Sequence, residues 1–229
     1  MEAEGFDAFA GEYVDILEAN LSLAGESAAA FTDRRLAYIR RTIPLLPRRL
    51  LDFGCGTGRE LPALAEAFPD AEIVGVDVSK EAIRVARRNV DDRRVKVFDT
   101  TEFAASEEAD FDMVYSSGVF HHIPPPERPA ALTLVKSTLR RGGVLVVSEH
   151  NPWHPGTRYL VRACPFDVGV ELIRPRRFAR QVTEAGLELV RLDYVSFFPG
   201  PLKFASALEP WLRRVPAGGQ YVVVARRSD

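Results

Sequence analysis

Cysteine is scarce in this sequence of 229 residues, which contains only Cys55 and Cys164. Two cysteines make no disulfide framework, so a reducing compartment suits the composition. The formal net charge is only −2, and such a chain has no global positive field to attract nucleic acid or a membrane surface. No apolar run reaches the length that spans a bilayer, and the N-terminus has no apolar segment of the signal-peptide type. We therefore expect a soluble cytoplasmic protein that binds neither nucleic acid nor membranes.

Predicted strands and helices alternate from residue 48 onward. Strands are expected at 49–53, 71–77, 95–98, 111–116, 144–149, 187–195 and 220–226. Helices are expected at about 6–17, 27–41, 57–68, 79–89, 124–139 and 175–185. This alternation, in a chain of this length, indicates a doubly wound α/β domain with a mostly parallel sheet. The stretches 150–174 and 197–219 interrupt the rhythm, and the second is expected to hold one helix.

Three glycines at alternate positions come after the first predicted strand, in the sequence L-L-D-F-G-C-G-T-G-R-E at 50–60. Gly54, Gly56 and Gly58 permit positive φ and let the backbone approach a ligand closely. The next helix directs its first N–H groups at that ligand. A dinucleotide-binding loop, G-x-G-x-x-G, would need glycine at position 59, which is Arg59.

Asp77 ends the second predicted strand. It lies about 20 residues after Gly56, where an acidic side chain accepts hydrogen bonds from ribose hydroxyls. The alternative is that Asp77 is a turn residue before Ser79, the predicted cap of the next helix.

Four short patterns together carry a family resemblance: D-F-G-C-G-T-G, V-G-V-D, F-D-T and F-D-M-V-Y-S-S-G-V-F-H-H-I-P, within about 36–192. They resemble the class I S-adenosylmethionine (SAM)-dependent methyltransferases, and among these the small-molecule group that includes ubiquinone and menaquinone methyltransferases. The resemblance implies SAM as cofactor, S-adenosylhomocysteine as product, and a Rossmann-like sheet of seven strands with an antiparallel last strand.

The resemblance also implies how the chain is organised. A single methyltransferase domain is expected over 1–229, with a SAM-binding core at 47–150. An N-terminal helical cap at 1–46 either packs against the sheet or closes over the site as a lid. The insertions after strands five and six, 151–174 and 197–219, are expected on the substrate side.

The same resemblance implies the cofactor contacts. Asp77 is expected to bind the ribose, whereas Asp99 and Thr100 are expected at the adenine, although Asp99 could equally start a turn. Asp52 is expected near the ammonium of the methionine moiety, together with backbone carbonyls at Ser116. The full predicted set comprises Asp52, Gly54, Cys55, Gly56, Gly58, Asp77, Val78, Asp99, Thr100 and Ser116.

Methyl transfer needs in-line alignment of the nucleophile with the sulfonium methyl, and a neutral oxygen or nitrogen also needs a base. All four histidines lie after strands four and five, and histidine titrates near neutral pH. His121 is the predicted base, and His122 is interpreted as a packed structural residue. Glu149 and His150 are the alternative, so the predicted catalytic set is His121, His150 and Glu149.

A metal site is not predicted. His150 and His154 are separated by three residues and Cys164 lies further on, but such a site would need a fourth ligand and groups that orient the ligands. Metal-dependent quinone O-methyltransferases of similar fold carry E-x-x-E-H where this sequence has G-V-F-H-H, at 118–122. The carboxylates of that motif are therefore absent.

The segment after strand four constrains the acceptor most. It has no [DN]-P-P-[YF], the motif that reads the planar amine of adenine, cytosine or a glutamine amide. Some arginines form either a solvated face or a clamp for an anionic substrate: Arg158, Arg162, Arg174, Arg176 and Arg177. Some aromatic residues either line an acceptor pocket or pack the insertions together: Trp153, Tyr159, Phe166, Phe197, Phe198 and Trp211.

The predicted function is transfer of a methyl group from SAM to a small organic molecule, aromatic or anionic, at oxygen in preference to nitrogen or carbon. The alternatives are methylation of RNA or protein, and a SAM-binding module without transferase activity. Arg59 argues against a nicotinamide-dependent oxidoreductase. The acceptor pocket is expected between the N-terminal helices, the His121 loop and the two insertions.

Overall fold

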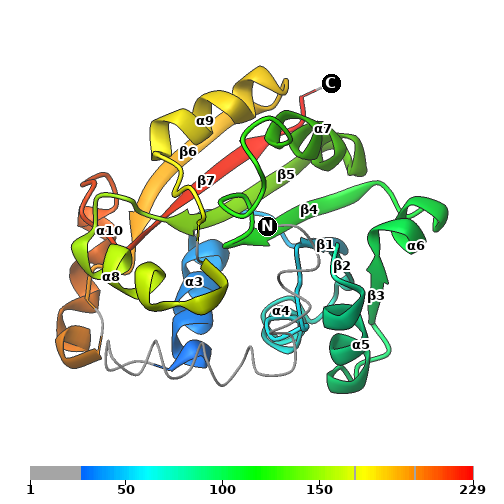
Figure 1. The fold of residues 1–229 in the computed structure, drawn as a ribbon, viewed down its shortest axis with the longest axis horizontal. Coiled ribbons are helices and arrows are strands. Elements are labelled where there is room, and N and C mark those ends of the chain that lie inside the picture. The colour runs from blue at the N-terminus through cyan, green and yellow to red at the C-terminus, as the bar shows by residue number, and fades with distance from the viewer. Residues whose placement is uncertain (1–26, 168, 199, 229) are drawn as a thin grey trace.

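Seven strands form one sheet in the computed structural model, in the order β3-β2-β1-β4-β5-β7-β6 (Figure 1). The structure describes residues 27–167, 169–198 and 200–228, so the helix expected at 6–17 lies outside the described residues. The strands are β1 Arg49–Phe53, β2 Glu72–Asp77, β3 Val95–Asp99, β4 Phe111–Ser117, β5 Leu139–His150, β6 Glu188–Val195 and β7 Gln220–Arg226. β7 runs antiparallel to β5 and β6, while the pairs from β3 to β5 are parallel. The predicted fold class is confirmed.

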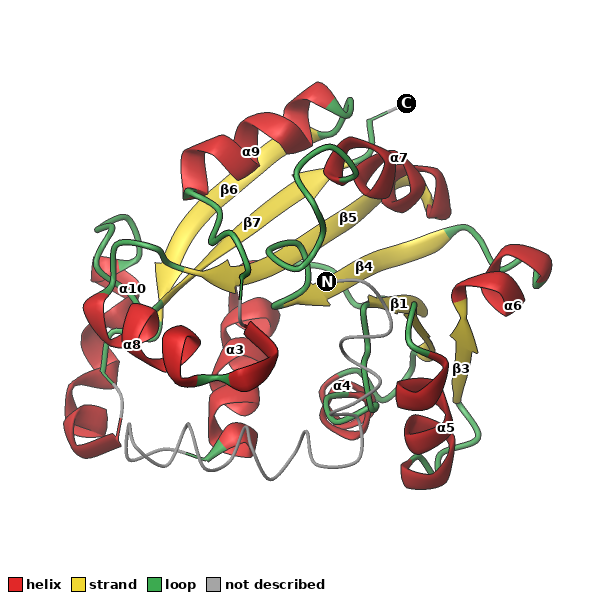
Figure 2. Ribbon diagram, viewed as in Figure 1, coloured by secondary structure: helices red, strands yellow, loops and turns green. Residues whose placement is uncertain are grey.

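Helices cover both faces of the sheet (Figure 2). Apolar residues of α3 Ala28–Thr42, α4 Leu61–Ala67 and α5 Lys80–Asn89 pack on one face. Those of α6 Thr100–Ala105, α7 Arg128–Thr138 and α9 Pro175–Glu184 pack on the other. The two long connections hold α8 Pro155–Ala163 with the short 3-10 helix η1 Pro165–Asp167, and η2 Gly200–Leu208 with α10 Glu209–Leu212. None of the helices in the described part of the chain is long and apolar enough to cross a membrane.

Local sequence signals explain several helix ends. Ser79 caps α5 by accepting a hydrogen bond from the N–H of Ala82 at 3.0 Å, and Glu81 lies in the first turn, where the helix dipole favours a negative charge. Ser27 caps α3 in the same way, through the N–H of Ala30. Both caps therefore fix the helix boundaries that the sequence predicts.

Several elements differ from the prediction: α8 was not expected in the first insertion, and α7 begins at Arg128 instead of 124. The helix after the glycine loop starts at Leu61 instead of 57, because the loop residues themselves form a turn. The six-residue α6 was not predicted, and the second insertion holds the nine-residue 3-10 helix η2 and the four-residue α10 instead of one α-helix. β5 begins at Leu139 instead of 144, because Leu139 pairs with Phe111 ahead of an irregularity in the β4–β5 register.

Candidate functional site

The glycine loop lies at the carboxyl end of β1, with the N–H groups of Gly54 and Cys55 donating to Val76 O at 2.8 and 3.0 Å. Gly54, Gly56 and Gly58 have φ of 81°, 54° and 76°, in the left-handed region where glycine is favoured. A Cβ on Gly54 would lie only 2.4 Å from Cγ2 of Val119. The loop thus needs glycine for its conformation and, at Gly54, for its contact with the β4 side of the site.

Asp77 combines the two interpretations that its position allows. Its Oδ2 accepts from the N–H of Gly56 at 2.9 Å, and its Oδ1 accepts from the N–H of Ser79 at 2.9 Å. The carboxylate is therefore a turn residue and also lies against the glycine loop. In the register of β2 and β3, Asp77 is paired with Asp99.

Asp99 caps α6 in the structure. Its Oδ1 accepts from the N–H groups of Thr101 and Glu102 at 2.8 and 2.9 Å, and the Glu102 side chain accepts from the Asp99 N–H. This is a capping box. Asp99 therefore starts a turn, as one of its two interpretations expects. Contact of Asp99 and the exposed Thr100 with adenine stays a prediction.

Asp52 and Cys55 are both buried beside the glycine loop. Burial raises the pKa of the Asp52 carboxyl well above its usual range, and the nearby carboxylates of Glu60 and Asp77 add to the shift. The Cys55 side chain packs beneath β2, since a Cβ on Gly75 would lie 2.9 Å from its Sγ. A ligand at this loop would therefore meet the backbone of Cys55.

A buried ionic network joins α3 to the glycine loop, and sequence reasoning missed it. Glu60 accepts hydrogen bonds from Arg35, Arg59 and the hydroxyl of Tyr115, each at 2.6 Å. Burial alone would raise the pKa of Glu60, but the two guanidinium groups outweigh burial and lower it. Arg59, which excludes a dinucleotide-binding loop by its position, is thus a structural partner of the next residue in the chain.

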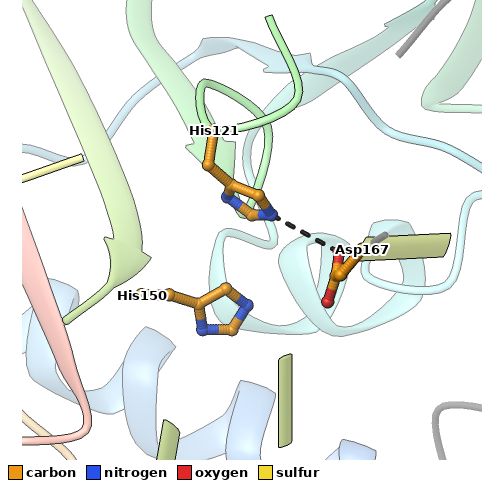
Figure 3. Close-up of side chains that lie close together, drawn as sticks. All are labelled: His121, His150 and Asp167. Carbon is orange, nitrogen blue, oxygen red and sulfur yellow. Dashed lines mark ion pairs between the residues drawn. The ribbon is translucent and has the colours of Figure 1, made fainter. Parts of the chain in front are cut away.

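A second cluster lies where β4 and β5 end, and Figure 3 shows part of it. His121 Nδ1 lies 2.6 Å from Glu149 Oε2, while Glu149 Oε1 accepts from the N–H groups of Val119 and Phe120 at 3.1 and 2.7 Å. The His121 and His150 ring centroids are 5.1 Å apart. The structure therefore brings together the three residues of the predicted catalytic set.

Asp167 completes this cluster from η1, and sequence reasoning missed this residue too. Its Oδ1 lies 3.3 Å from Nε2 of His122 and 3.7 Å from Nε2 of His121. Asp167 sits in a three-residue 3-10 helix within an irregular insertion, so no periodic pattern marks it. His122, expected to be a packed residue, is partly exposed and contacts Asp167.

The two central imidazoles have opposite charge preferences. Burial opposes protonation of His121, but the carboxylates of Glu149 and Asp167 raise its pKa to about 9. Burial and the neighbouring His121 lower the pKa of His150 to about 4. The two carboxylates therefore favour the imidazolium form of His121, whereas burial and the neighbouring His121 favour the neutral form of His150.

Of the metal ligands considered from sequence spacing, His154 and Cys164 have other roles. His154 Nδ1 accepts from the N–H of Thr157 at 3.1 Å and caps α8, and Cys164 is buried at the end of that helix. Within the described residues, the metal-ligating groups that lie close together are instead His121, His150 and Asp167.

The charged and aromatic residues of the insertions are largely at the surface. All five arginines of the proposed clamp are exposed, and Arg177 pairs with the exposed Glu171 at 2.7 Å. Trp153, Tyr159 and Trp211 are 48%, 62% and 78% exposed. This arrangement corresponds to the solvated-face interpretation of the arginines.

Comparison with known proteins identifies the family. The family described as "Methyltransferase domain" matches residues 51–145. The chain is 32% identical over 178 residues to the ubiquinone biosynthesis O-methyltransferase of Aromatoleum aromaticum, covering 72% of this chain and 74% of that protein. A SAM-dependent methyltransferase from Archaeoglobus fulgidus shares the fold, with a TM-score of 0.63 and 20% identity over 85% of this chain and 94% of that one. The chain belongs to the class I SAM-dependent methyltransferases.

Within that class, the sequence is distantly related to several enzymes of different name. The relatives at about 30% identity include further ubiquinone biosynthesis O-methyltransferases. The trans-aconitate 2-methyltransferase of Deinococcus radiodurans is 33% identical over 122 residues, covering 51% of this chain and 45% of that protein. The protein is therefore a SAM-dependent methyltransferase.

The residues around the glycine loop fit SAM. The hydroxyls of Thr57 and Ser116 are buried and have no hydrogen-bond partner among the described residues, so a polar ligand would satisfy them. An ammonium group beside Asp52 would stabilise its ionised form. Val78, 59% exposed next to Asp77, offers an apolar surface suited to a base or ribose.

Proposed function

We propose that this enzyme methylates an oxygen atom of a small organic molecule bound beside the His121–Glu149 pair. The observation that carries the proposal is the buried contact of 2.6 Å between these side chains, at the ends of β4 and β5. Because Glu149 contacts Nδ1, a contact between this imidazole and an acceptor would use the other ring nitrogen, Nε2. The relative from Aromatoleum aromaticum, named as an O-methyltransferase, supports oxygen as the acceptor atom.

SAM supplies an electrophilic methyl group on a sulfonium. Asp77 is proposed to bind the ribose and Asp52 the ammonium, while Thr57 and Ser116 complete the polar surroundings. These contacts hold the cofactor at β1 and β2. The acceptor then approaches from β4 and β5, where His121, Glu149 and His150 orient its oxygen. As the bond to the methyl carbon forms and the bond to sulfur breaks, the oxygen gives up its proton to this cluster or to water.

The experiment that tests this proposal is an acceptor screen. The purified enzyme is incubated with SAM and panels of phenols, hydroxy acids, carboxylic acids and amines, and S-adenosylhomocysteine release is measured. We expect turnover with an oxygen acceptor, and we expect Glu149→Gln to lower that turnover while SAM affinity stays unchanged. Turnover restricted to amines, RNA or protein would contradict the proposal.

A further inference from the structure

We propose that His121, His150 and Asp167 form a binding site for a divalent transition-metal ion. One ligand atom from each residue lies within 4.8 Å of the other two, and Figure 3 shows the three side chains converging. An ion held at about 2.0–2.2 Å by nitrogen and oxygen ligands separates those ligands by about 3–4 Å. The observed spacing therefore needs only a small inward rotation of side chains.

The orientation of His121 is the second observation that points to a ligand. This residue is only 3% exposed, and its Nε2 is buried without a hydrogen-bond partner among the described residues. The nearest carboxylate oxygen, Asp167 Oδ1, is 3.7 Å away, beyond hydrogen-bond distance. Buried polar atoms are normally satisfied, so a ligand between the two groups would remove this deficit. Because the carboxylates favour protonation of His121, a metal ion that binds Nε2 would replace its proton and release it to solvent.

Glu149 provides the support that metal-binding histidines usually have. Its carboxylate accepts at Nδ1 of His121, which fixes the ring with Nε2 on the side of Asp167. Two backbone N–H groups in turn hold the other oxygen of Glu149. A carboxylate on the far nitrogen of a ligating histidine orients it and strengthens it as a ligand. His122 similarly contacts Asp167 and positions its carboxylate.

The donor set indicates the class of ion. Two imidazoles and one carboxylate suit Zn²⁺, Fe²⁺, Co²⁺ or Mn²⁺, whereas Mg²⁺ and Ca²⁺ prefer oxygen ligands throughout. Three protein ligands leave coordination positions open. Metal binding itself does not depend on the proposed function. The role of the ion does rest on that function: an ion here would bind the acceptor oxygen and lower its pKa.

The test is metal binding by the full-length protein after treatment with a chelator. Zn²⁺ is titrated by calorimetry, and Co²⁺ by its visible absorption, into the wild type, His150→Ala and Asp167→Asn. We expect one ion per chain and at least about 100-fold weaker binding by each variant, because loss of a group that only orients a ligand already costs about 10–100-fold. His154→Ala, which removes another histidine of the same connection, is the matched control and should bind like the wild type.

His150 and Asp167 are only partly buried, so their variants are preferable to those of His121. Circular dichroism and the SAM affinity of each variant report whether it is folded. Glu149→Gln should weaken binding about 10–100-fold without changing the stoichiometry. No binding by the wild type, or equal affinity in His150→Ala and Asp167→Asn, would overturn the proposal. A metal-binding protein that methylates no oxygen acceptor would contradict the proposed function and leave the metal site standing.

Discussion

At the scale of single residues, Asp77 is the side chain on which the cofactor assignment most depends. It already accepts two backbone hydrogen bonds that shape the glycine loop. We expect Asp77→Ala to weaken SAM binding by about 1–3 kcal/mol, the range for hydrogen bonds to a charged group. Asp77→Asn, which keeps one carbonyl acceptor, should lose less. Isothermal calorimetry with SAM measures both, and unchanged affinity in the alanine variant would move the ribose contact elsewhere.

Two features favour glycine at position 54: its left-handed backbone conformation and its close contact with Val119. Gly54→Ala should destabilise the fold by about 2–4 kcal/mol, since overpacking and left-handed strain add. Val119→Ala in the same chain removes Cγ1 and Cγ2, the two atoms nearest to the new Cβ, so the double variant should recover part of the loss. A double-mutant cycle from denaturant unfolding gives the coupling. Zero coupling would show that the contact with Val119 does not restrict this position.

The buried Asp52 predicts a dependence of cofactor binding on pH. Burial and two carboxylates raise the pKa of Asp52 in the free enzyme, and the proposed ammonium contact would lower it again. SAM affinity should therefore rise with pH in the range below about 7.7–8.0, the pKa of an α-amino group, where the ammonium keeps its proton. Calorimetry in buffers of different ionisation enthalpy should detect proton release on binding. If Asp52→Asn showed the same pH profile as the wild type, another group would be responsible.

At the scale of elements, Glu60 links α3 to the glycine loop. Glu60→Gln leaves the buried Arg35 without its counter-charge, and breaking a buried pair in this way costs about 3–5 kcal/mol. Urea unfolding measures the loss. Glu81→Gln, which removes an exposed pair with Arg84, is the control and should cost at most about 1 kcal/mol. If Glu60→Gln and Glu81→Gln lowered the free energy of unfolding equally, the buried network would contribute no more stability than an exposed ion pair.

The sequence predicts the regular elements better than their junctions. β1 and β7 have the predicted bounds, because runs of apolar residues end at turn residues on both sides. α6 has only six residues, too few for a helical period to appear. The sequence predicts the glycine loop and Asp77 as site residues because their spacing along the chain forms a recognisable pattern. The pairing of Glu60 with Arg35 and the approach of Asp167 to His121 depend on tertiary packing, which leaves no local pattern.

At the scale of the whole molecule, the strand order determines how the site is divided. Parallel strands β2, β1, β4 and β5 end at one edge of the sheet, where open α/β sheets bind their ligands. The glycine loop, Asp52 and Asp77 lie at one half of this edge. His121, Glu149 and His150 lie at the other, so the order of the strands places the proposed cofactor and acceptor sites next to each other.

The central claim is that the methyl group passes to an oxygen at the second half of this edge. The most direct measurement uses SAM labelled with ¹³C in its methyl group, together with an acceptor found in the screen. The carbon chemical shift of the product distinguishes a methyl group on oxygen from one on nitrogen or carbon. We predict a methoxy or methyl ester signal that is strongly reduced in Glu149→Gln, and an N-methyl or C-methyl signal would contradict the account.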